Sequence, residues 1–518
     1  MTTSMFKTGM NRSLLTKDFF QTILDRAYGP RAVQTKSWSE RELDSSSSIL
    51  SSISSGDDDD NDDDYSQEPA ALSTASSDEK EPCPMNDMTG HFLYKIEYTS
   101  SSTHTRSSPS SSTSSTSSRS PLYLDPFSSP FAGAASSSSI SIAATSQTDT
   151  QLACTTPSSD EGELWVVIKS KPIDTALIEL TNIMAQLQGG DLADEYEMVK
   201  DMTGFKNSHV REMELAELSW EVQGAMERIS TKVYNVLRND SQQLYALCLE
   251  YLDPSMGNIT HLNSTDSALT AWSPNDIHLV MRDLASFHAQ FLGQEERLLD
   301  MSFLENPTRS SMKTLRPAYE AMIKTNGKND PELFSSYLTQ CTLEYLAHSD
   351  EHWATIERNP RTLIHGDFNT RNICMRLDPS TGAQTLCAYD WELACCQVPQ
   401  RDVVEFLAFV LPPGSNEWEH YIEYHRLALK EAYKKQCSSL SSQSSRQVTI
   451  PSSQEYAEAA KIALMDFASL RLAMYGISNS FKSVDWLPRI IQSVEGQLKK
   501  MGPLRSRHSD RVLQYAKF

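Results

Sequence analysis

The stretch LIHGDFNTRNICMRLDPSTGAQTLCAYDWELA, residues 363–394, holds two carboxylates and an amide at short intervals. Asn372 follows Asp367 by five residues, and Asp390 comes after an apolar run. A carboxylate such as Asp367 can accept the proton of an attacking hydroxyl, while Asn372 and Asp390 offer the hard oxygen ligands that Mg²⁺ prefers. The spacing therefore predicts a phosphoryl-transfer site that uses Mg²⁺ and the phosphates of ATP.

Phosphate groups also need a cation from the opposite wall of a cleft, and the segment GELWVVIKSKP (162–172) supplies one. Trp165, Val167 and Lys169 alternate along a strand pattern, so they share one face of the strand. We expect Val167 to cover the adenine ring while Lys169 reaches the phosphates.

Two further segments complete the expected nucleotide site. In HVREMELAE, a helix glutamate should orient the lysine; Glu212 is the first candidate and Glu214 the second. In LEYLD, which follows the last strand of the small lobe, the Glu250 carbonyl and the Leu252 amide are placed to pair with the adenine edge.

HGDFNTRNI together with YDWE resembles the aminoglycoside phosphotransferase and choline-kinase-like group of small-molecule kinases, close to its ecdysteroid-kinase-like branch. The VVIK strand, the NSHVRE helix, the LEYL connector and the LASFHA helix extend the resemblance over most of the ordered chain. The resemblance implies a protein-kinase-like fold in which Asp367 is the catalytic base and Asn372 and Asp390 bind metal. It also implies that Lys169 and Glu212 form the ion pair that holds the phosphates.

The order of the elements predicts an α+β fold of two lobes, a small strand-rich N-terminal lobe and a larger helical C-terminal lobe. We place the nucleotide-binding lobe at 1–252 and the helical lobe, with the catalytic and metal-binding loops, at 253–518. Expected helices include 14–30, capped by Thr16, and 273–293, capped by Ser273.

Ser- and Asp-rich tracts interrupt this pattern. They lie at about 44–85, 100–160 and 437–454, and we expect them to be disordered insertions because they cannot bury enough apolar surface to offset the entropy of ordering. The family's glycine-bearing phosphate loop is represented only by NDMTGHF, with the single Gly90.

Composition limits the setting. The formal net charge is −22, but residues 44–82 hold twelve Asp or Glu and one Lys, so half of the excess lies in one expected loop. The absence of a basic stripe argues against nucleic-acid binding, and the sequence contains no apolar stretch long enough for a membrane span. Nine irregularly spaced cysteines suggest reduced thiols in a cytoplasmic protein, with organelle targeting by the N-terminus left open.

Several residues near the motifs have structural interpretations. We expect His365 to hold the catalytic loop, Asp402 to cap a helix and tie back to that loop, and His288 to be a satisfied core histidine. Trp391 is expected to pack, while Glu392 is a candidate supporting group behind the metal ligand.

The sequence thus predicts an ATP-dependent phosphotransferase that acts on a hydroxyl of a small metabolite. A catalytically silent, nucleotide- or metabolite-binding scaffold is the alternative. Protein kinase activity is disfavoured because no APE-like anchor follows Asp390. The acceptor should bind to the helical region at 415–435 and 455–500, with amino alcohols, sterols, sugars and aminoglycosides as candidates and a slight tilt toward a cation. The oligomeric state is not readable.

Overall fold

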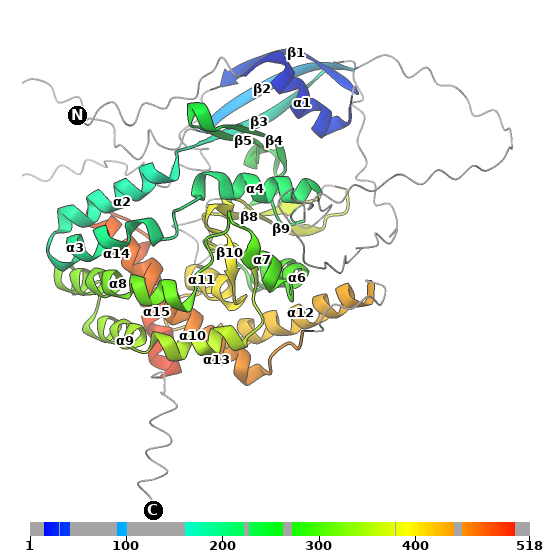
Figure 1. Cartoon of the computed structure of the whole chain (residues 1–518). Helices are drawn as coiled ribbons and strands as arrows, with labels where there is room; N and C mark the ends of the chain where they lie inside the picture. Colours follow the sequence, from blue (N-terminus) through cyan, green and yellow to red (C-terminus); the bar gives the residue numbers. More distant parts are fainter. Residues whose placement is uncertain are drawn as a thin grey trace, which may run out of the picture.

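A computed structural model describes residues 15–30, 32–41, 91–100, 161–221, 226, 228–262, 272–378, 380–439 and 448–502. An antiparallel sheet forms one end of the molecule and a helical body forms the other (Figure 1). The predicted α+β architecture of two lobes is confirmed. Most of the three expected insertions, the segment around Gly90 and both chain ends lie outside the described residues. No described helix is long and apolar enough to cross a membrane.

The sheet has the strand order β1-β2-β3-β5-β4, with antiparallel pairing throughout. The strands are β1 (Val33–Arg41), β2 (His91–Ser100), β3 (Glu161–Lys171), β4 (Val233–Asn239) and β5 (Leu244–Glu250). Helix α1 (Lys17–Tyr28) covers one face, where its Phe20, Ile23 and Leu24 join a core with side chains of β2 and β3. Helix α4 (Ser208–Glu221) packs on the other face. β3, the central strand, is therefore enclosed and its lysines are held away from bulk water.

Strand β1 is not among the elements predicted from the sequence. Its sequence VQTKSWSER buries little besides Val33 and Thr35, because it is an edge strand that pairs only with β2. An edge strand with a mostly polar sequence gives too weak an alternation to be recognised. Tertiary pairing with β2, more than fifty residues away, creates the strand.

The helical body contains α2 (Asp174–Gln188), α3 (Gly190–Val199), α6 (Pro274–Phe291), α7 (Glu295–Asp300), α8 (Arg309–Asn329), α9 (Ser336–Ala347), α10 (Ser349–Arg358), α11 (Gln400–Val410), α12 (Trp418–Ser439), α13 (Ser453–Asp466), α14 (Ala473–Asn479) and α15 (Leu487–Met501). Thr16 and Ser273 cap α1 and α6 as predicted. Residues 437–439 belong to α12 and α13 begins at Ser453, so the third expected insertion is shorter than predicted.

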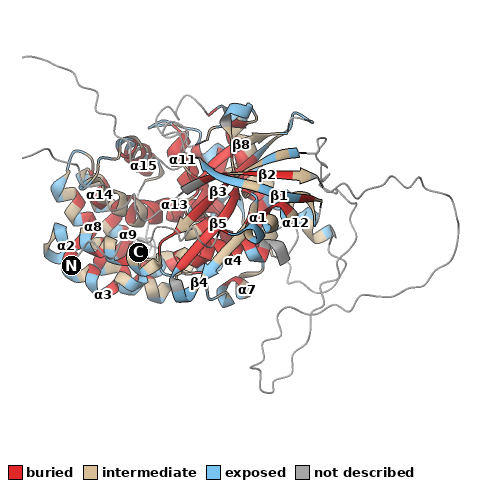
Figure 2. Cartoon of the chain, turned by 90° about the horizontal axis from the view of Figure 1, so that it is seen from above, coloured by how far each residue is buried: buried red, intermediate tan, exposed pale blue. Residues whose placement is uncertain are grey.

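The buried side chains of the helical body form one continuous core. Although α2 and α3 precede residue 252, Ala185, Leu192 and Tyr196 belong to this core rather than to the sheet. The helix α11 lies at its centre and is buried along its whole length, as the red ribbon in Figure 2 shows.

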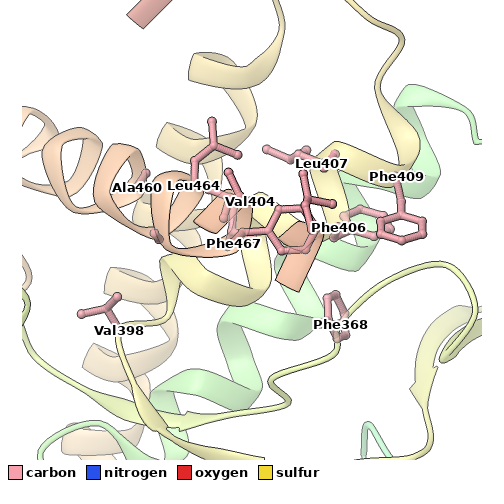
Figure 3. Close-up of a cluster of buried hydrophobic side chains, with 14 of the residues drawn as sticks. Phe368, Val398, Val404, Phe406, Leu407, Phe409, Ala460, Leu464 and Phe467 are labelled. Atoms are coloured by element: carbon pink, nitrogen blue, oxygen red, sulfur yellow. The ribbon is translucent and has the colours of Figure 1, made fainter. Parts of the chain in front are cut away.

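The segment 362–397, which contains the HGD and DWE motifs, lies between the sheet and the helical body and forms short strands and loops. β7 (Thr362–Ile364) pairs with β10 (Cys395–Gln397), and β8 (Ile373–Leu377) pairs with β9 (Gln384–Ala388) and with β6 (Ile259–Thr260). Phe368, next to Asp367, is fully buried and its ring centroid lies 5.8 Å from that of Phe406 on α11 (Figure 3). The core thus fixes the loop that carries the predicted base.

Candidate active site

Lys169 joins three elements that are distant in the sequence. Its Nζ atom donates hydrogen bonds to Glu212 Oε2 on α4 and to Asp390 Oδ1 of the DWE segment, both at 2.8 Å. The Lys169 and Glu212 side chains are almost fully buried. Glu214, the second candidate, pairs with Arg238 instead. The structure therefore brings together the lysine, the first-choice glutamate and the aspartate that the motifs singled out.

A second lysine, missed in the sequence, lies beside the first. Lys171 Nζ donates to Glu212 Oε2 and to Glu392 Oε2, both at 2.9 Å, and its side chain is 2% exposed. Lys169 and Lys171 are two residues apart on β3 and so point to the same face. The two-residue period of the strand was the signal from which Lys171 could have been found in the sequence. Lys171 in turn bonds Glu392, the candidate supporting group.

The electrostatics of this cluster favour its charged state. Burial alone would lower the pKa of Lys169, but the carboxylates of Asp390 and Glu212 outweigh burial and raise it. Burial would raise the pKa of Asp390, yet Lys169 and Lys171 lower it to about 2. Oppositely charged neighbours thus keep these groups ionised at neutral pH.

Asp367 and Asn372 form a compact pair on the loop after β7. Asn372 Nδ2 donates to Asp367 Oδ2 at 2.8 Å, and Asn369 Nδ2 donates to Asp367 Oδ1 at 3.0 Å. Because its amide nitrogen is engaged, Asn372 presents its Oδ1 atom away from Asp367.

The backbone at both ends of the segment is unusual. Gly366 has φ of 78°, and a Cβ there would collide with the Leu393 carbonyl oxygen, so only glycine fits. Asp390 adopts φ of 66°, which is uncommon for a non-glycine residue and typical of functional sites. The Gly-Asp step and the aspartate of DWE are therefore held in conformations that tertiary contacts maintain.

Asp402 of α11 supports the catalytic loop from behind. Its carboxylate accepts the backbone N–H groups of His365 at 2.8 Å and Gly366 at 3.0 Å. The predicted tie to the loop is confirmed, although Asp402 lies inside α11 and does not cap it. His365 Nε2 lies 2.9 Å from the Tyr389 carbonyl, while its Nδ1 accepts the Asp367 N–H. These two contacts confirm that His365 holds the loop.

His288 continues the support into the core. Its Nε2 contacts Asp402 Oδ2 and its Nδ1 contacts His425 Nε2, each at 3.2 Å, and His425 Nδ1 contacts the Tyr456 hydroxyl at 2.7 Å. Burial keeps the pKa of His425 well below its ordinary value. One proton arrangement satisfies the chain: Tyr456 donates to His425, His425 to His288, and His288 to Asp402. The prediction of a satisfied core histidine at position 288 is confirmed.

The other face of Asp367 is lined by residues that the sequence reading missed. The Tyr475 hydroxyl donates to Asp367 Oδ1 at 3.1 Å. Guanidinium nitrogens of Arg371 and Arg471 lie 3.7 and 3.8 Å from the carboxylate. Burial would raise the pKa of Asp367, but Arg471 and Arg371 hold it well below its usual range. Arg371 lies inside the quoted motif, whereas nothing in the local sequence linked residues 471 and 475 to it.

The remaining residues expected to contact the nucleotide are Val167, Glu250 and Leu252, which lie on or just after strands of the five-stranded sheet. Val167 is buried on β3 and pairs in register with Leu249 of β5. Glu250 ends β5, and its side chain is paired with Arg376. Leu252 is buried with Ile259 under the β8–β9 hairpin. Their roles toward adenine remain predictions.

The donor set fits Mg²⁺ bound together with phosphates. Within the described residues no cluster of three or more His, Cys, Asp or Glu side chains could hold a metal. Asn372 Oδ1 and Asp390 Oδ2 have no hydrogen-bond partner in the described parts of the chain, so both oxygens are available. Mg²⁺ is usually bound by one or two protein oxygens plus substrate phosphates, which matches this pair.

One family model and several solved structures are similar to parts of this chain. The ecdysteroid kinase-like family matches residues 268–438, and the predicted resemblance is confirmed there. Similar solved structures include Plasmodium vivax ethanolamine kinase, at 12% identity over 65% of this chain and 76% of that chain, with a TM-score of 0.31. Choline kinase LicA from Streptococcus pneumoniae matches at 12% identity over 64% and 86%, with a TM-score of 0.32. A search of curated proteins found no match.

Proposed function

We propose, from the match of residues 268–438 to the ecdysteroid kinase-like family and from the site geometry, that the protein transfers the γ-phosphate of ATP to a hydroxyl of a small-molecule metabolite. One observation carries the proposal: Lys169 Nζ bonds both Glu212 and Asp390, although Asp390 is 221 positions away in the sequence. A buried lysine on a central strand, oriented by a helix glutamate and facing an aspartate that could bind metal, is the arrangement that protein-kinase-like phosphoryl transfer uses.

Each side chain has a defined task in this proposal. Lys169 turns from Asp390 to the phosphates while Glu212 keeps it in place. Asn372 and Asp390 would hold Mg²⁺, which would supply charge neutralisation at the phosphates. Asp367 orients the acceptor hydroxyl and takes its proton as the hydroxyl oxygen bonds to the γ-phosphorus and the bond to the ADP oxygen breaks. The low pKa of Asp367 suits a reaction that depends on positioning more than on base strength.

The first test measures the binding of magnesium and ATP, independently of catalysis. Magnesium and ATP should raise the melting temperature of the wild-type protein, since a ligand of the native state stabilises it, and Asp390→Ala should lose this rise. Asp378→Ala, on the exposed β8–β9 turn, is the matched control and should keep it. Absence of any rise in the wild type would favour the silent-scaffold alternative.

The second test concerns the base. Asp367→Asn should bind magnesium and ATP normally but release ADP at least about 100-fold more slowly with any accepted alcohol, within the range typical of general bases. Equal rates in the variant and the wild type would remove Asp367 from the mechanism.

A further inference from the structure

Two arginines share a single carboxylate at the proposed site. Within the described residues the only ion pair of Arg371 and of Arg471 is with Asp367, at 3.7 and 3.8 Å. The third nearby arginine, Arg401, is already paired with Glu405 and Asp466. Asp367 is therefore the one carboxylate among the described residues that lies within 4 Å of the guanidinium groups of Arg371 and Arg471.

Arg371 is held rigidly with its charge retained. Its Nη2 donates to the Tyr475 hydroxyl at 2.9 Å and its Nε donates to Asn369 Oδ1 at 3.1 Å. The guanidinium also lies over the rings of Trp486 and Phe409, 4.7 and 5.9 Å from their centroids. Aromatic faces stabilise such a cation without neutralising it.

Arg471 makes fewer hydrogen bonds than Arg371 and retains free donors. Among the described residues its one hydrogen bond is to the Gly366 carbonyl, at 2.9 Å, and its side chain is 15% exposed. A guanidinium has five N–H donors in a planar fork, so most of those of Arg471 remain available to a ligand. The residue lies in a π-helical segment, Phe467–Leu472, between α13 and α14, a distortion that is frequent at functional sites.

These groups lie on the acceptor side of the site. Lys169, Glu212 and Asp390 define the nucleotide side, and none of the residues proposed to bind nucleotide comes after position 390. Arg471 and Tyr475 come from the C-terminal helices and contact Asp367, the residue proposed to receive the acceptor proton. A protonated amine bound beside Arg371 and Arg471 would be repelled by two like charges. A carboxylate or phosphate would instead accept hydrogen bonds from planar guanidinium groups, whose paired N–H donors match its oxygen atoms.

We propose that Arg371 and Arg471 form an anion subsite for the acceptor, so that the substrate is an alcohol that carries a carboxylate or phosphate group and not an amino alcohol. This inference rests on the proposed function and makes its substrate class specific. This substrate class is the opposite of the slight preference for a cationic acceptor that the overall acidic composition suggested. That composition says little about this site, since half of the acidity lies in residues 44–82, far in sequence from it.

The test uses three probes that carry a benzylic hydroxyl on one ring and differ in the para substituent, which is anionic, neutral or cationic: 4-(hydroxymethyl)benzoate, 1,4-benzenedimethanol and 4-(aminomethyl)benzyl alcohol. Binding to the full chain is measured by calorimetry, with ADP release measured separately. The wild type should bind the anionic probe at least about tenfold more tightly than the neutral probe, and the cationic probe least, as one charge-assisted pair would give.

Variants assign that preference to the arginines. Arg471→Gln should abolish it, Arg471→Lys should keep part of it, and Arg316→Gln, on the exposed face of α8, should leave it intact. Arg371→Gln serves as a second variant if Arg471→Gln does not fold. Tighter binding of the amine, no binding of the anion at millimolar concentration, or a preference that survives both glutamine variants would overturn the proposal.

Two outcomes separate this inference from the proposed function. If Arg471→Gln slows ADP release equally for all three probes and leaves their relative affinities unchanged, the arginines serve the transferred phosphoryl group and the acceptor assignment is wrong. If the anion preference holds but magnesium and ATP do not bind, the subsite stands and the phosphotransferase function fails.

Discussion

Lys171 Nζ lies 2.9 Å from Glu212 Oε2, the same oxygen atom that accepts a hydrogen bond from Lys169. The strand β3 therefore presents two ammonium groups to one glutamate. In the proposed mechanism, Lys171 would keep Glu212 in its position when Lys169 turns to the phosphates.

Lys171→Met should lower the free energy of unfolding by about 3 kcal/mol, because it removes the cation paired with Glu392 and one of the two cations paired with the buried Glu212. The affinity for magnesium and ATP should also fall. Lys200→Met, which breaks surface pairs with Glu179 and Glu197, should cost under about 1 kcal/mol. Urea denaturation measures both, and equal costs would show that the Lys171 network is not buried in solution.

Gly366→Ala should abolish activity and destabilise the protein by several kcal/mol, on the order of 3 or more. The left-handed φ is unfavourable for alanine, and the new Cβ would meet the Leu393 carbonyl. Gly382→Ala is the control, since its φ is also positive but its Cβ would meet nothing within 4 Å. Comparable loss in both variants would mean that backbone strain alone, and not the close approach to Leu393, fixes the glycine.

Glu405 should make stability depend on pH. Burial raises its pKa to about 7, so between about pH 4.5 and pH 7 the folded protein keeps a proton that the unfolded chain releases. Its contribution is present below that window and is lost as the pH rises through about 7, at up to about 1.4 kcal/mol per pH unit.

Glu405→Gln should remove this component, so that urea melts from about pH 5 to about pH 8 show a variant that gains on the wild type as the pH rises. Glu431→Gln, at an exposed position of α12, should follow the wild-type profile. Parallel profiles for Glu405→Gln and the wild type would contradict the raised pKa.

Tyr456→Phe should weaken the support of the catalytic loop. The change removes the hydroxyl that lies 2.7 Å from His425 Nδ1 and leaves that buried nitrogen without a donor, at a cost of about 1–3 kcal/mol. We expect kcat to fall severalfold while the KM for ATP stays unchanged, because the chain ends on Asp402 and not on the nucleotide site. Tyr433→Phe, which loses one bond from the Val448 N–H, should leave kcat unchanged.

The fold was predictable where periodicity was strong. The helix α6 and strands β3 and β5 follow their apolar patterns, and the pair Asp367 and Asn372 is fixed by spacing within one loop. The strand β1 was not predictable, because the formation of an edge strand depends more on pairing with its neighbour than on the β-propensity of its own residues.

The sequence by itself determined the family resemblance and which residues are candidates for the chemistry. The residues of the HGD and DWE segments and the VVIK lysine predict a phosphoryl-transfer site, because short spacings and side-chain donor types are local properties. Only the tertiary structure decided which glutamate meets Lys169, that Lys171 shares it, and that Arg471 and Tyr475 face Asp367. These contacts join residues up to 221 positions apart, and helix packing around one core, which no local pattern encodes, brings them together.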